Sequence, residues 1–219
     1  MKTKTAFLFC TVLAVSALPV VSQAAQDLDK VFGSITVDAG QSVGNVSLVN
    51  GAITLESNSR AKDVDTVNGS IELFGGAQLD SATTVNGSIE IAESVNISGD
   101  VTTVNGSVSV AAQSHIGGNV ETVNGDISLT DASADRDLTT VNGDISLTGD
   151  TVVQGDIVFK KRGKKWSFFG FNSDDNKPTL TIGRNVQLSG KIVLQQDVIL
   201  KLENPALAGK VEKRFSDNR

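Results

Sequence analysis

The sequence predicts an all-β fold: a single-stranded parallel β-helix (β-solenoid) of about nine rungs, each 18–19 residues long. Three observations predict it. The tripeptide Val-Asn-Gly recurs at nearly constant spacing, apolar and polar residues alternate around it, and the apolar positions fall into columns when the repeats are aligned. Asn-Gly also favours type I′ hairpins, which would give an antiparallel meander. Hairpins do not require a constant repeat length, whereas stacked rungs do.

The repeat valines follow one another at intervals of 18 or 19 residues, after a degenerate first copy at Val31: Val49, Val67, Val85, Val104, Val123 and Val141. Four residues after the repeat valine lies an Ile or Val, so Ile71, Ile89, Val108 and Ile127 are expected to stack in the interior. The asparagines are expected to hydrogen-bond along the rod: Asn50, Asn68, Asn86, Asn105, Asn124 and Asn142. At the corner, Gly is expected to permit the turn and Asn to tolerate a left-handed backbone.

Residues 1–25 are typical of a secretory signal peptide. Lys2 and Lys4 precede an apolar run over 6–21, and Ser22-Gln23-Ala24 offers a cleavage site between small residues. The predicted organisation is therefore a signal peptide at 1–25, a β-solenoid at 26–211 with an insertion at 160–179, and a charged C-terminal tail at 212–219. This predicts an exported protein, located in the periplasm or at the surface of a bacterium.

Composition argues against several classes of function. One Cys and one His are too few for a Cys/His zinc site, a disulfide framework or a Cys–His nucleophile. The net charge of −6 argues against nucleic acid as the main partner. His115 is expected to point outward into solvent, and the carboxylates considered for glycoside hydrolysis, Asp126, Asp144 and Asp156, are expected on a solvated face. We therefore predict no enzyme activity, no catalytic residues, no cofactor and no metal site.

The insertion differs from the rest of the chain in charge and aromatic content. Residues 25–159 contain 4 basic and 19 acidic residues, whereas residues 160–219 contain 13 basic and 6 acidic ones. Two interpretations are open: a loop that contacts an anionic membrane surface, an envelope glycan or a partner protein, or a hairpin whose aromatic side chains pack on the solenoid. The candidate binding residues are Lys160, Lys161, Arg162, Lys164, Lys165, Trp166, Phe168, Phe169 and Phe171.

The ends of the repeat region differ as well. Asn204-Pro205 and the charged tail are expected to form a partial cap, whereas only residues 25–30 precede the first rung. Because open strand edges invite pairing, the first rung is the predicted site of end-to-end self-association.

The repeated strings TVNGSI and TVNGDI resemble the β-repeats of bacterial adhesin-like domains. The short rungs with Ile182-Gly183 and Leu188-Ser189-Gly190 steps are also similar to those of bactofilins, the polymer-forming β-solenoid proteins. The resemblance covers residues 31–159 and 180–211, and it implies a right-handed coil and end-to-end assembly. Bactofilins are typically cytosolic, so the export signal departs from that pattern. The predicted function is that of a non-enzymatic, adhesin-like structural protein of the cell envelope that self-associates. The alternative is a module that binds anionic glycan or lipid through the basic-aromatic loop.

Overall fold

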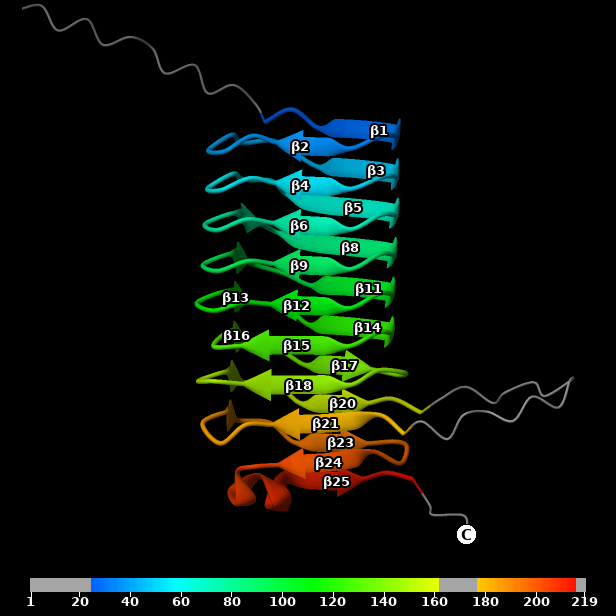
Figure 1. The fold of residues 1–219 in the computed structure, drawn as a ribbon, viewed down its shortest axis with the longest axis vertical. Helices are drawn as coiled ribbons and strands as arrows, with labels where there is room; N and C mark the ends of the chain where they lie inside the picture. The colour runs from blue at the N-terminus through cyan, green and yellow to red at the C-terminus, as the bar shows by residue number, and fades with distance from the viewer. Residues whose placement is uncertain (1–24, 162–176, 216–219) are drawn as a thin grey trace, which may run out of the picture.

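The computed structural model describes residues 25–161 and 177–215, which form a rod of three parallel sheets (Figure 1). Sheet A comprises β1 (Leu28–Phe32), β3 (Val46–Asn50), β5 (Asp63–Asn68), β8 (Ser81–Asn86), β11 (Val101–Asn105), β14 (Val120–Asn124), β17 (Leu138–Thr140), β20 (Ile157–Phe159), β23 (Ile192–Leu194) and β25 (Val211–Lys213). Sheet B comprises β2 (Ile35–Val37), β4 (Ile53–Leu55), β6 (Ile71–Leu73), β9 (Ile89–Ile91), β12 (Val108–Val110), β15 (Ile127–Thr130), β18 (Ile145–Thr148), β21 (Thr179–Ile182) and β24 (Ile199–Leu202). Sheet C comprises β7 (Gln78–Leu79), β10 (Asn96–Ile97), β13 (His115–Ile116), β16 (Ser133–Ala134), β19 (Val152–Val153) and β22 (Gln187–Leu188).

Each strand pairs in parallel with the equivalent strand of the next rung, so the predicted β-solenoid of about nine turns is confirmed and the hairpin meander is excluded. In sheet B, Val108 pairs with Ile89 on one side and with Ile127 on the other. These side chains, together with Ile71, are fully buried. The spacing that aligned them in the sequence therefore places them in one interior column.

The threonine of the TVNG motif also points inward, and its hydroxyl bonds to the backbone in four copies, whereas the hydroxyl of Thr66 is buried without a partner among the described residues. Thr84 Oγ1 donates to the carbonyl oxygen of Gly69 at 2.9 Å, and Thr103 Oγ1 donates to that of Gly87 at 3.0 Å. Because a buried hydroxyl without a partner is costly, this bond explains why a polar residue is tolerated in the core at this corner. Each bond also ties one rung to the rung before it.

The repeat glycine is required by space rather than by its backbone conformation. Only Gly33 and Gly51 of this column have φ in the left-handed region, and none of the six repeat asparagines does, so the expected left-handed corner is wrong for most rungs. A Cβ on Gly87 would overlap the carbonyl oxygen of Gly69, and the same overlap recurs at Gly106. Backbones of successive rungs approach too closely here for any side chain.

The other residues with a left-handed backbone lie in the turn between sheets B and C, and their φ angles are between 51° and 78°. More than half of them are not glycine; the full set is Gly40, Asn58, Gly76, Ser94, Gln113, Asp131 and Gly149. Sequence alone gave no sign of this column because its residue type varies from rung to rung. The conformation is therefore imposed by the stacking of the turns.

The insertion separates β20 from β21 at the corner between sheets A and B (Figure 1). Both strands stay in register with the rung before them, since Phe159 pairs with Thr140 and Leu180 with Ile145. Across the corner, Gln196 Nε2 donates to the carbonyl oxygens of Val141 at 2.6 Å and Lys160 at 3.0 Å. Gln196, which follows β23, thus links its rung to the two rungs before it through Val141 and Lys160, which follow β17 and β20.

Candidate functional site

The asparagine column forms a continuous side-chain ladder at the corner between sheets A and B. Asn105 Nδ2 donates to Asn86 Oδ1 at 2.9 Å and Asn105 Oδ1 accepts from Asn124 Nδ2 at 2.8 Å. The same bond joins Asn50, Asn68, Asn86 and Asn142 to their neighbours. Because each amide is engaged by the next, the ladder serves the stacking of rungs and leaves little hydrogen-bonding capacity for a ligand.

The carboxylates considered for catalysis have a similar structural role. Asp126 Oδ1 accepts the backbone N–H of Asp144 at 2.8 Å, and Asp144 Oδ1 accepts that of Thr179 at 2.8 Å. Asp156 lies in a different column, where its Oδ1 accepts the N–H of Lys191 at 2.8 Å. These side chains therefore satisfy corner amides of the following rung rather than forming a pair across a substrate.

His115 belongs to a cluster that sequence analysis missed. Its Nδ1 lies 3.0 Å from Ser133 Oγ, and its Nε2 lies 3.4 Å from Asp135 Oδ2. A Ser-His-Asp set is the arrangement of a hydrolase, but such an enzyme also needs free donors for an oxyanion. On this face of sheet C, the N–H groups of Ser133 and Asp135 donate to carbonyls of the preceding rung. These two N–H groups are therefore not available to bind an oxyanion.

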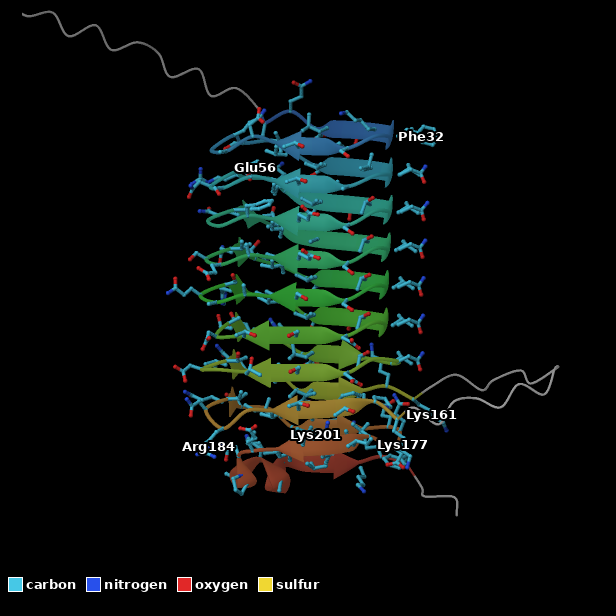
Figure 2. The ribbon with its side chains drawn as sticks, in the orientation of Figure 1. Phe32, Glu56, Lys161, Lys177, Arg184 and Lys201 are labelled. Carbon is cyan, nitrogen blue, oxygen red and sulfur yellow. The ribbon has the colours of Figure 1, made fainter. Side chains whose placement is uncertain are left out.

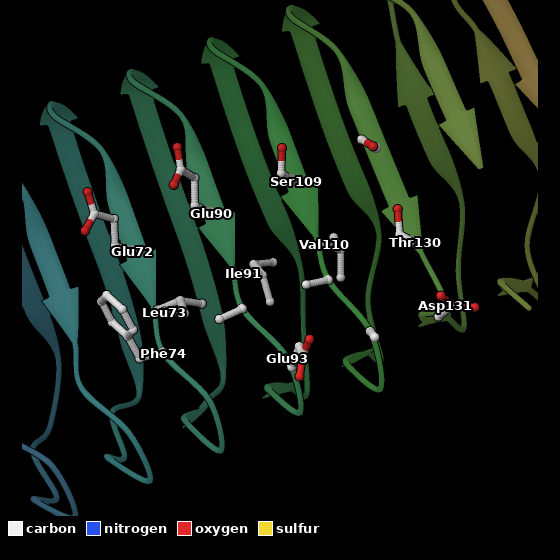
Figure 3. Close-up of a pocket in the computed structure, with 14 residues that line it drawn as sticks. Glu72, Leu73, Phe74, Glu90, Ile91, Glu93, Ser109, Val110, Thr130 and Asp131 are labelled. Atoms are coloured by element: carbon white, nitrogen blue, oxygen red, sulfur yellow. The ribbon is translucent and has the colours of Figure 1, made fainter. Parts of the chain in front are cut away.

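A shallow groove of about 670 Å³ lies along the outer face of sheet B (Figure 3). Ala92 and Ala111 are among its lining residues, and Phe74 lies at one end (Figure 3). Glu72 and Glu90 occupy adjacent strands beside it, where like charges repel. In the described part of the chain no cation pairs with either carboxylate, and no cluster of three or more potential metal ligands occurs there.

At the N-terminal end, the first strands are unpaired edges within the part of the chain that the structure describes. β1 and β2 are the first strands of sheets A and B, and no described residue pairs with their outer edges. Leu28 N donates to the carbonyl oxygen of Asn45 at 2.8 Å, so the amide of Leu28 faces the second rung. Backbone amides alternate in direction along a parallel strand, so the amide of Val31, three residues later, faces away from the rod. Val31 and Phe32 are 58% and 75% exposed, and Phe32 projects from the first rung (Figure 2).

An apolar stripe continues from this end along the outer face of sheet A. Val49, Val67 and Val85 are exposed below Val31 and line a groove of about 590 Å³. Asp65 lies in the same groove, where burial raises the pKa of its carboxyl, with the charge of Asp63 adding to the shift and a hydrogen bond from Thr83 opposing it. This apolar groove is therefore contiguous with the N-terminal edge strand.

At the C-terminal end, β24 and β25 are the last strands of sheets B and A, and a short 3-10 helix, η1 (Pro205–Lys210), lies between them in the sequence and contacts β24. Leu207 from this helix is buried in the core, and Lys210 Nζ donates to the carbonyl oxygens of Ser189 at 2.9 Å and Gly190 at 3.3 Å. Asn204 Oδ1 accepts from Ala206 N at 3.1 Å at the start of the helix. The two ends of the rod thus differ, because only the C-terminal one carries a capping element among the described residues.

Two of the predicted binding residues of the insertion are described. Lys160 Nζ lies 3.6 Å from Glu121 Oε1, and the N–H of Lys161 donates to Gln195 Oε1 at 3.4 Å. The others lie outside the described residues: Arg162, Lys164, Lys165, Trp166, Phe168, Phe169 and Phe171. The predicted signal peptide also lies outside them, except for Ala25.

Comparisons with family models, with curated proteins and with solved structures find no match for this chain. None of the described segments is a helix long and apolar enough to cross a bilayer. The class of the protein is therefore defined by its fold, a parallel β-solenoid.

Proposed function

We propose that this protein is a non-enzymatic, adhesin-like structural element of a bacterial envelope that self-associates through its N-terminal end. The observation that carries the proposal is the difference in apolar exposure between the two ends: Val31 and Phe32 are exposed on the first strand, whereas η1 buries Leu207 at the other end. Solenoids need capping at their termini to remain soluble as single units. An uncapped end with exposed apolar residues is suited to pairing with a second copy.

Sedimentation of the mature protein over a range of concentrations tests this proposal. We expect the mass of the parent to rise with concentration, and Val31→Pro to remain monomeric with a similar melting temperature, because proline removes an outward amide at the edge. Phe74→Ser is the matched control, since Phe74 is an exposed aromatic on a lateral face. A parent that stays monomeric, or a Val31→Pro variant that assembles like the parent, contradicts the proposal.

Export is a separate part of the proposal and has its own experiment. It is supported by the charged, apolar and small-residue segments of 1–25. Expression of the full chain in a Gram-negative host should release a periplasmic protein that begins near Ala25, as measured by intact mass. An uncleaved chain in the cytoplasm would contradict it. The predicted right-handed coil also belongs to this proposal, on the family resemblance alone.

A second candidate function is the binding of anionic glycan or lipid through the basic-aromatic loop. The change of charge at residue 160 favours it. The triple variant Trp166→Ala, Lys164→Glu and Lys165→Glu should abolish binding to lipopolysaccharide at low salt and barely change the melting temperature. Unfolding of that variant would instead identify the loop as a packing element.

A further inference from the structure

Charge is divided along the rod, independently of the 162–176 segment. Residues 25–159, which form the first seven rungs and β20, carry 4 basic and 19 acidic residues, a net charge of −15. The described residues that follow, 160–161 and 177–215, carry 9 basic and 3 acidic residues, a net charge of +6. The sign of the charge thus changes within the last rungs.

Several cations of the last rungs have no partner in the described structure. Ion pairs engage Lys177 with Asp197 at 2.6 Å, and Lys191 and Arg214 with Glu212 at 3.2 and 2.8 Å. The side chains of Lys161, Arg184 and Lys201 are exposed and form no ion pair or hydrogen bond with described residues. They are free to interact with an external anion.

These three cations lie on sheet B and at the two corners that bound it, all within the last rungs of the rod. Lys161 lies at the corner after β20, Lys201 lies on β24, and Arg184 follows β21 at the opposite edge (Figure 2). A bilayer lying along the whole of this face would also meet the carboxylates of Glu72 and Glu90 on earlier strands of sheet B. A surface that meets the end of the rod can be approached by all three.

We propose that the C-terminal end of the rod binds an anionic lipid bilayer end-on, with the acidic N-terminal end directed away from it. Each Lys or Arg near such a surface contributes about 1 kcal/mol. Nine rungs at about 4.8 Å make a rod of about 40 Å. Electrostatic interactions are screened over about 8–10 Å at physiological salt, so an upright rod keeps most of its carboxylates out of the repulsive field of the bilayer. A rod lying flat brings them into it.

This inference shares an anionic partner with the second candidate function, but it assigns the contact to the folded last rungs. Every variant tested below retains the cations of residues 162–176, so any difference in binding between variants comes from the substituted residues. It rests on the envelope location for its biological setting and does not depend on self-association, which is measured without lipid.

The first experiment is co-sedimentation of the mature protein with vesicles of equal parts phosphatidylglycerol and phosphatidylcholine at low salt. Arg184→Glu with Lys201→Glu should weaken binding by at least about tenfold. Arg60→Glu with Lys62→Glu makes the same change of net charge near the other end, and it should change binding less than about twofold. Equal losses in the two variants, no loss in either, or no binding by the parent would each overturn the proposal.

The second experiment measures orientation. The mature chain has no cysteine, since Cys10 lies in the predicted signal peptide. A fluorophore on Glu203→Cys should transfer energy efficiently to a headgroup dye in the same vesicles, and one on Ser34→Cys should transfer much less. Equal transfer from the two positions indicates a rod lying flat and overturns the end-on arrangement.

Discussion

At the scale of single residues, the close approach of rungs at the corner predicts a specific sensitivity to added atoms. In Gly87→Ala the new Cβ would overlap the carbonyl oxygen of Gly69, so two backbones would have to separate. We expect a loss of at least about 2 kcal/mol in the free energy of unfolding, measured by chemical denaturation. Gly209→Ala is the control, because nothing lies within 4 Å of its added Cβ and its φ is not left-handed. Equal stability of the two variants would disprove the close approach.

The residue scale also marks the limit of prediction from sequence. The asparagine ladder could be predicted because it depends on repeat spacing alone. The need for glycine at the corner could not be predicted, because it depends on the distance between rungs. The cluster of Ser133, His115 and Asp135 could not be predicted either, because the sequence does not show which residues lie beside its one histidine. Nor could the sequence predict the free cations Arg184 and Lys201, whose significance lies in their position on the sheet B side of the last rungs.

At the scale of elements, each short strand is held by the equivalent strands above and below it, so a core substitution should act locally and strongly. Ile89 in β9 is fully buried between Ile71 and Val108. Ile89→Ala should lower the free energy of unfolding by about 2–5 kcal/mol. The adjacent Glu90→Ala points outward and should stay within about 0.5 kcal/mol of the parent in the same denaturation experiment. Similar values for the two would refute the inward column.

The elements were also the easiest part of the fold to predict. The alternation of apolar and polar residues predicted the strands. The repeat length of 18–19 residues predicted which strands pair, because a parallel stack keeps one register throughout. The insertion was recognised by the missing Val-Asn-Gly between Phe159 and Leu180. The hydrogen bond from Gln196 to Val141 was not predicted, because the two residues are 55 positions apart and the contact follows no repeat.

At the scale of the whole molecule, the proposed behaviour depends on the two ends remaining different. Leu207 is the buried contact of η1 with the core, and the helix packs at the C-terminal end beside β24. Leu207→Asp would place an unpaired carboxylate in this contact, so the helix should detach and leave the last rung uncapped. We expect larger assemblies than the parent forms at the same concentration, measured by light scattering after gel filtration. Val31→Pro combined with Leu207→Asp should still assemble, because the new open end remains. If Leu207→Asp instead has the same mass as the parent and an unchanged melting temperature, η1 is not the element that closes the rod.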